Sequence, residues 1–260
     1  MKFFLILFCS AALIVLSLTN CTKAIPDPIH DTITIHTTDT LTLHHTDTVT
    51  QYKTDTLFRG DTLIITLTLQ PGLNNGQNTL VTSDLYAAFN LNSNPDIYAG
   101  TWTYNAQGGG TGIGRTYLKF IGLDGMPNSA IILSAKLSLY GISSGVAAPQ
   151  GNSTGTDNSG WLKRLTTDWN PDSVTWNNQP AETDINKVAV PASTSVWNYD
   201  APNLDVTNLV DDMLNNINYG FAFEGQMEQT YRSLSFASCK VADQTKWPKL
   251  VVVYEIFKHP

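Results

Sequence analysis

The feature that most constrains the fold is a succession of short alternating segments across residues 80–254, separated by turns rich in Gly, Asn, Ser and Pro. In 115–120 apolar and polar side chains alternate, and 135–140 repeats the pattern. A period of two places the apolar residues on one face of a strand. Many short strands with turn signals between them predict an all-β fold, a jelly-roll β-sandwich.

One short helix is expected among these strands. Asp205 is a residue type that caps helix N-termini, and Asn215-Asn216 supplies a stop. The apolar residues between them recur at helical spacing and form one face: Val206, Leu209, Val210 and Met213.

The N-terminus has the layout of a signal peptide. Lys2 is followed by an apolar run over 3–18, which is too short for a comfortable membrane span. The run ends before Cys21 in a pattern that resembles the lipobox of bacterial lipoproteins. We therefore expect a signal peptide at 1–20, lipidation of Cys21 and a bacterial outer-membrane or cell-surface location. Asn20 stands where a small residue is usual, which leaves cleavage by the ordinary secretory peptidase open.

A repeat follows an anchor linker at 21–30. Asp-Thr pairs recur across 31–69 at intervals of eight, eight, eight and six residues, each followed by an aliphatic residue. The triplet resembles an acceptor sequence for bacterial O-glycosylation. The candidate acceptors are Thr32, Thr40, Thr48, Thr56 and Thr62.

Parity is the informative property of this repeat. Nearly all aliphatic residues carry odd numbers and nearly all threonines even numbers. A strand with two distinct faces requires this, because a one-residue slip exchanges the faces. We expect an extended, Thr-rich β-like stalk over 31–70, with its aliphatic face covered by other copies of the chain. The alternative is a flexible tether. A turn-rich linker at 71–78 then leads into the folded module, 79–260.

Charge and cysteine content exclude some functions. A net charge of -7 with no basic stripe argues against nucleic acid as a partner. Outside the signal and its edge only Cys239 remains, so we expect no intramolecular disulfide and a buried, inert thiol.

The order of the segments resembles the DNRLRE-domain family, which is related to carbohydrate-binding module family 96. The matching pieces include 115–120, 135–140, 167–170, the stretch Val174-Thr-Trp-Asn-Asn-Gln-Pro180, 205–207, 218–221 and 248–254. The resemblance implies a β-sandwich of bacterial extracellular proteins, with alginate-like polyuronate as one ligand class.

Catalytic machinery is not evident. No histidine occurs between Asn74 and Lys258, which removes the commonest general base and zinc ligand. Glycoside hydrolysis needs two carboxylates across the bond, and the sequence pairs none of its candidates: Asp168, Asp172, Glu182, Asp184, Glu224 and Glu228. We therefore expect a non-enzyme. A polysaccharide lyase using Tyr with Arg or Lys is the minor alternative.

Two constellations are candidates for carbohydrate binding. Trp102 with Tyr104, and Trp197 with Tyr199, each share a strand face on which sugar rings could stack; ordinary sandwich packing is the alternative.

The second constellation is cationic. Arg115, Tyr117 and Lys119 share one polar face, and Lys136 and Tyr140 share another. If the two strands are neighbours, they form a patch suited to a uronate-containing polysaccharide, because Arg grips a carboxylate bidentately. A solvated sheet face is the alternative.

No cofactor or metal is assigned. Asp157, Asp184 and Asp200 stand in polar loops that would suit calcium, but no EF-hand pattern occurs. The sequence thus predicts a surface-anchored, non-catalytic carbohydrate-binding lipoprotein. The alternative is a structural cell-surface or fibre protein that self-associates through the stalk.

Overall fold

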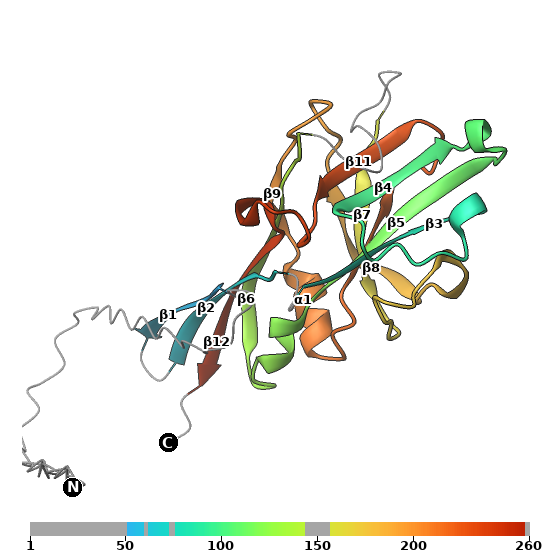
Figure 1. Ribbon diagram of the computed structural model, residues 1–260. Coiled ribbons are helices and arrows are strands. Elements are labelled where there is room, and N and C mark those ends of the chain that lie inside the picture. Colours follow the sequence, from blue (N-terminus) through green and yellow to red (C-terminus); the bar gives the residue numbers. More distant parts are fainter. Residues whose placement is uncertain (1–50, 60–61, 73–75, 144–156, 258–260) are drawn as a thin grey trace, which may run out of the picture. The chain divides into compact units, whose positions relative to one another are not determined.

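The computed structural model describes residues 51–59, 62–72, 76–143 and 157–257 (Figure 1). The predicted signal peptide, Cys21, the anchor linker and repeat residues 31–50, with Thr32, Thr40 and Thr48, lie outside the described residues.

One sheet has five antiparallel strands in the order β1-β2-β12-β6-β9. Their bounds are β1 Gln51–Arg59, β2 Thr62–Gln70, β6 Ile131–Leu139, β9 Ala201–Asp205 and β12 Lys249–Phe257. The apolar C-terminal strand β12 thus lies inside the sheet, between β2 and β6.

The other sheet has seven antiparallel strands. Six follow the order β11-β4-β5-β10-β7-β8, and β3 pairs with β5. Their bounds are β3 Gly76–Thr82, β4 Asp96–Thr103, β5 Thr111–Phe120, β7 Gly160–Leu165, β8 Glu182–Val190, β10 Phe221–Gly225 and β11 Arg232–Ala237.

The main core joins the inner faces of both sheets. Leu137 and Leu250 from the five-stranded sheet belong to one buried cluster with Leu118, Phe223 and Phe236 from the other. The predicted inward residues of β6 and β5 are all buried, because alternation along each strand points every second side chain to the core. The predicted all-β sandwich is confirmed.

The expected helix is α1, Thr207–Leu214, and its four predicted apolar residues are buried. It begins two residues after Asp205, whose Oδ1 accepts hydrogen bonds from the Thr207 backbone N–H at 3.2 Å and from the Thr207 hydroxyl at 2.6 Å. In the described part of the chain, no helix has the length and apolar character needed to cross a membrane.

The second half of the predicted stalk, as strands β1 and β2, belongs to the five-stranded sheet. β1 and β2 pair antiparallel with Arg59 opposite Thr62, so the chain reverses here instead of continuing as one strand. In β2 the odd-numbered aliphatic residues do share a face: Ile65 and Leu69 are buried in the main core, and Leu63 and Leu67 pack against it. That face is covered by the chain's own module, not by other copies, and the folded part begins before residue 79.

Candidate functional site

The predicted cationic face of β5 is on the outer side of the seven-stranded sheet. Arg115 and Tyr117 alternate with Leu118 and Phe120, which fill the main core, as the pattern predicted. Tyr117 is only 1% exposed, however. A carbohydrate-binding role for Tyr117 therefore conflicts with its position.

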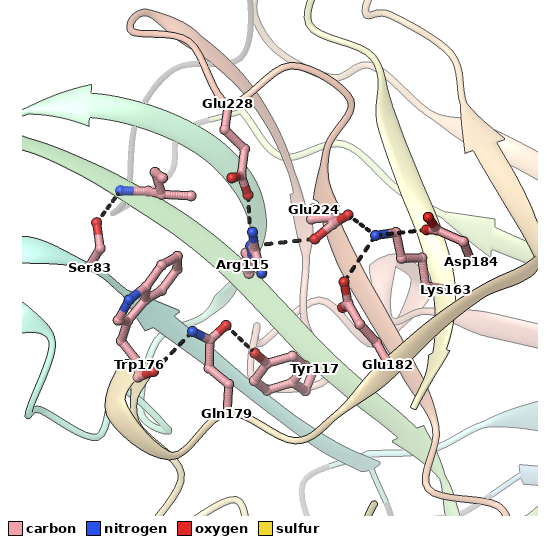
Figure 2. A network of polar contacts seen from close by, with 11 residues as sticks. Ser83, Arg115, Tyr117, Lys163, Trp176, Gln179, Glu182, Asp184, Glu224 and Glu228 are labelled. Atoms are coloured by element: carbon pink, nitrogen blue, oxygen red, sulfur yellow. Dashed lines mark hydrogen bonds and ion pairs between the residues drawn. The ribbon is translucent and has the colours of Figure 1, made fainter. Parts of the chain in front are cut away.

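The segment between β7 and β8 covers this ring. Trp169, Val174 and Trp176 belong to a second apolar cluster around Tyr117. The Tyr117 hydroxyl donates to Gln179 Oε1 at 2.7 Å, and Gln179 Nε2 donates to the Trp176 carbonyl at 2.9 Å (Figure 2). The polar end of Tyr117 is satisfied internally, so the residue packs the outer face of the sheet.

The joint cationic patch does not form. Lys136 lies on β6 and Tyr140 directly after it, in the five-stranded sheet, whereas Arg115 and Lys119 lie on β5 in the other sheet. Lys136 Nζ is 2.7 Å from Asp205 Oδ2, and Lys119 Nζ is 3.4 Å from Asp124 Oδ2. Each cation already faces a carboxylate of its own neighbourhood.

Arg115 belongs to a network of ion pairs (Figure 2). The sequence alone did not predict which carboxylates would be its partners. Its Nε lies 2.7 Å from Glu228 Oε1 and 3.4 Å from Glu224 Oε2. Lys163, on β7, extends the network: its Nζ contacts Glu224, and lies 2.9 Å from Glu182 Oε1 and 3.0 Å from Asp184 Oδ1. These residues come from β5, β7, β8 and β10 and from the turn that precedes β11.

The network neutralises its cations. Burial alone would lower the pKa of Lys163, but hydrogen bonds to Glu224, Glu182 and Asp184 outweigh it and raise the pKa. Burial raises the pKa of Glu224 against the opposing effect of Lys163. Even with Lys187, whose Nζ is 3.5 Å from Asp184, carboxylates outnumber cations. The arrangement ties four strands together, and its cations carry no excess of positive charge over the carboxylates they face.

An aromatic groove lies at another part of the same sheet. We define the aromatic groove by Tyr86, Phe89, Trp102, Tyr104 and Tyr231. A pocket of about 270 Å³ forms its floor, and its lining residues are Leu80, Thr82, Tyr86, Leu91, Asn94, Tyr98, Trp102 and Tyr104. The structure thus brings the predicted pair Trp102 and Tyr104 together in one concave surface.

The rings of the groove touch edge to face. Tyr86 lies with its centroid 5.3 Å from Tyr104 and 5.9 Å from Phe89, and Trp102 lies 5.2 Å from Tyr231. Phe89 is 58% exposed, and Tyr86 and Tyr231 are also exposed. Edge-to-face contacts of this kind hold aromatic rings in place. The groove therefore presents ordered apolar surfaces to solvent.

Two glycines of β5 make room for this floor. A Cβ at Gly112 would overlap the ring of Tyr104, and one at Gly114 would lie 2.5 Å from Cε1 of Tyr98. The glycines therefore let two tyrosine rings approach the β5 backbone closely. In a strand, glycine often marks such a close approach.

The loops of the groove carry backbone strain. Asp84 and Tyr231 have φ values of 61° and 67°, in the left-handed region that residues other than glycine rarely adopt. Asp84 Oδ2 accepts a hydrogen bond from the Gly110 backbone N–H at 2.5 Å, and the Tyr231 N–H donates to the Thr101 carbonyl at 2.8 Å. Strained residues cluster at functional sites, each at a cost of about 1–3 kcal/mol.

The second predicted aromatic pair is placed differently. Asn198 has a φ of 58°, so Trp197 and Tyr199 do not share a strand face. The Tyr199 ring packs 6.0 Å from Phe236, and its hydroxyl donates to the Pro191 carbonyl at 3.2 Å. Tyr199 supports the core, and neither residue lines the aromatic groove.

The three aspartates that were candidate calcium ligands each interact with a different group of the chain. Asp157 Oδ1 accepts from the Ser159 N–H at 2.8 Å, Asp200 Oδ1 accepts from the Gly141 N–H at 2.7 Å, and Asp184 is held by Lys163. Within residues 62–72, 76–143 and 157–257, no group of three His, Cys, Asp or Glu side chains is arranged to hold a metal ion.

The chain is thus a two-sheet β-sandwich module with an exposed aromatic groove beside one sheet. The model of carbohydrate-binding module family 96 matches residues 72–254, more than half of the chain. The chain therefore belongs to carbohydrate-binding module family 96. The β1–β2 hairpin precedes the matched residues. No curated protein matches the chain.

Proposed function

We propose that this protein binds a polysaccharide at the aromatic groove and does not cleave it. The observation that carries the proposal is the group of exposed rings, Tyr86, Phe89 and Tyr231, that contact one another or the rings lining a pocket. Pyranose rings present apolar C–H faces, which gain free energy by leaving water against an aromatic surface. Membership of a carbohydrate-binding family supports a carbohydrate as the occupant.

The groove suits a polymer better than the outer face of the seven-stranded sheet. On that face Tyr117 is covered and Arg115 is ion-paired with Glu228 and Glu224. A polymer would have to displace the segment 166–181 to reach Tyr117. At the groove Phe89 and Tyr231 already face solvent.

The ion-pair network also supports a non-catalytic role. Glycoside hydrolysis uses one carboxylic acid and one free carboxylate across the scissile bond. Glu182 and Glu224 are instead joined to the same Lys163 ammonium. The ion pairs of Glu182 and Glu224 with Lys163 link β8 and β10 to β7.

Loss of aromatic surface tests the proposal. We expect Phe89→Ala to weaken polysaccharide binding by about 10- to 100-fold, because burying a side chain of this size contributes roughly 1.5–3 kcal/mol. Trp102→Ala should act in the same direction. Titration calorimetry of the full-length protein against a panel of soluble polysaccharides measures the effect.

Trp197→Ala is the matched control, since it removes a partly exposed tryptophan outside the groove. Equal affinity of Phe89→Ala and the unmodified protein for every polysaccharide that binds would place the site elsewhere.

The lipid anchor is part of the same proposal. It is supported by the apolar run over 3–18 and by Cys21, and would hold the protein at the bacterial surface. Mature protein is expected to enter the detergent phase, and Cys21→Ser to prevent this. An intact mass with cleavage elsewhere and no lipid would contradict the anchor. Self-association through residues 31–50 stays a separate prediction.

A further inference from the structure

We infer that the β1 edge of the five-stranded sheet is the interface between two copies of this chain. The inference goes beyond the proposed function, because it names a protein partner instead of a carbohydrate. β1 is the first strand of its sheet, and among the described strands it pairs with β2 alone (Figure 1). In an antiparallel strand every second residue directs its backbone N–H and C=O groups to one side. The side of β1 that faces away from β2 therefore presents a row of backbone donors and acceptors to a further strand.

The other edge strands of the two sheets are interrupted or blocked. In β8 the φ of Asn186 is 59°, and the register with β7 shifts along the strand. β9 contains Pro202, which has no backbone N–H, and Asn203, whose φ is 54°. In β3, which pairs with β5, the Asn78 carbonyl accepts a hydrogen bond from Lys240 Nζ at 2.7 Å. Features of this kind protect a sheet edge from pairing with another chain.

β11 is covered as well, whereas β1 is not interrupted. The Ala237 N–H donates to the Tyr140 carbonyl at 2.8 Å, and the Ser233 carbonyl accepts from Asn158 Nδ2 at 2.8 Å. Within Gln51–Arg59 there is no proline and no positive φ, and all of β1 pairs with β2 in one unbroken register. Of the edge strands described, β1 is thus the one best prepared to accept another strand.

The sequence before β1 favours a second copy over the chain's own residues. A tight hairpin needs residue types such as Gly or Asn that adopt a positive φ, and Gly60 stands between β1 and β2. Residues 31–50 contain no Gly, Pro or Asn, so they lack the signal for folding back along their own β1. They do share with β2 the alternation of Thr and aliphatic residues, which favours a strand. A second copy offers this segment without a reversal, and a two-fold pair closes both edges.

The charge pattern selects the register of the pair. β1 lies antiparallel to residues 41–49 of the second copy, with Thr50 opposite Thr50 at the two-fold axis. Every residue of β1 then has a partner, and odd-numbered positions meet odd-numbered positions. Lys53 comes opposite Asp47 of the second copy, and the symmetry forms this pair twice. Opposite charges directly across an antiparallel pair are stabilising.

Neighbouring registers fit less well. A shift of one residue would exchange the two faces of one strand relative to the other. A shift of two residues in one direction would place Asp55 opposite Asp47, and like charges at opposed positions are destabilising. The same shift in the other direction would move Lys53 from Asp47 to His45 and lose the charge pair.

Sedimentation of the mature chain, residues 21–260, tests the interface. The chain carries Cys21→Ser, so that no lipid contributes to association. We expect a dimer. Asp47→Lys should weaken it about tenfold, because both symmetric pairs become repulsive, and adding Lys53→Asp to the same chain should restore it. Asp31→Lys is the matched control, since it makes the same charge change outside the paired residues.

Disulfide formation tests the register. Thr50→Cys should join the two copies under mild oxidation, because the two residues face each other at the axis. Thr54→Cys should not, since the two copies of this residue lie about 26 Å apart along the ribbon at about 3.3 Å per residue. A disulfide needs Cα atoms within about 7 Å. The native Cys239 does not compete, because it is only 4% exposed.

Three outcomes would overturn the inference. The first is a monomeric mature chain, whether hydrogen exchange finds the β1 amides open or protected by the chain's own residues. The second is a dimer that Thr54→Cys joins covalently and Thr50→Cys does not. The third is a dimer weakened by Asp47→Lys that Lys53→Asp fails to restore. Equal melting temperatures of the variants would exclude misfolding as the cause of any of these results.

Discussion

At the residue scale, adding one methyl group at Gly112 tests whether the floor of the aromatic groove is needed for stability and for binding. A Cβ there would overlap the Tyr104 ring, so Gly112→Ala must displace that ring from the floor of the pocket. We expect a loss of about 1–3 kcal/mol in the free energy of unfolding, which is typical of overpacking, together with weaker polysaccharide binding. Urea unfolding and calorimetry measure the two effects.

Gly125→Ala is the matched control, since a Cβ at Gly125 meets nothing within 4 Å. If Gly112→Ala changed neither the free energy of unfolding nor polysaccharide binding, the observed position of the Tyr104 ring would not be required for either.

Sequence reasoning found part of the groove at this scale. Trp102 and Tyr104 were predicted from their strand spacing, whereas Tyr86, Phe89 and Tyr231 were missed. Tyr86 ends a single 3-10 turn that begins at Asp84, Phe89 lies in the loop after it, and Tyr231 directly precedes β11; Asp84 and Tyr231 adopt left-handed conformations. No periodicity encodes such a loop. The only signal was a pair of aromatic residues, Tyr86 and Phe89, in a short segment before the Asn-rich stretch at 90–94.

At the scale of elements, Asp205 couples the start of α1 to β6. Lys136 and Thr207 hydrogen-bond its carboxylate and lower its pKa to about 2. Because the folded pKa is depressed, the stabilisation is present above the ordinary aspartate pKa of about 3.9 and is lost as pH falls towards about 2. Asp205 is largely exposed, so solvent screening limits the ion pair to roughly 1 kcal/mol or less.

We therefore expect Asp205→Asn to keep an oxygen that accepts from Thr207 but to remove this acid-dependent term, and Asp205→Ala to cost about 0.5–1.5 kcal/mol through loss of the hydrogen bonds to Thr207 as well. Unfolding free energies across a pH series measure both. If the free energy of unfolding of Asp205→Asn depended on pH in the same way as that of the unmodified protein, the acid-dependent contribution would not come from Asp205.

For the strands, the sequence predicted which side chains face the core but not which strands lie next to each other. Alternation correctly predicted which side chains of β5 and β6 face the core, because the period of a strand is local. It could not say which strands are neighbours, since pairing depends on how distant segments pack. The cationic patch failed for that reason. The parity of the repeat likewise predicted the two faces of β2 but not the reversal of the chain between β1 and β2.

At the scale of the whole molecule, the extent of the folding unit is the testable quantity. β12 lies between β2 and β6, so a chain that starts at residue 79 lacks β1 and β2 and opens one edge of β12 along most of its length. It also loses Ile65 and Leu69 from the main core. An open, apolar strand edge is a template for aggregation.

We expect residues 51–260 to unfold cooperatively as a monomeric unit, and residues 79–260 to aggregate or to unfold at a markedly lower temperature. Within the full-length protein, Leu69→Ala should cost about 2–5 kcal/mol, because it empties a buried site. Thr68→Ala, on the outer face of the same strand, should change stability by about 0.5 kcal/mol or less. Calorimetry and light scattering measure these differences. A monomeric 79–260 fragment with the melting temperature of the longer chain would show that the β1–β2 hairpin is an accessory to the sandwich, and that the boundary at 79 is the boundary of the folding unit.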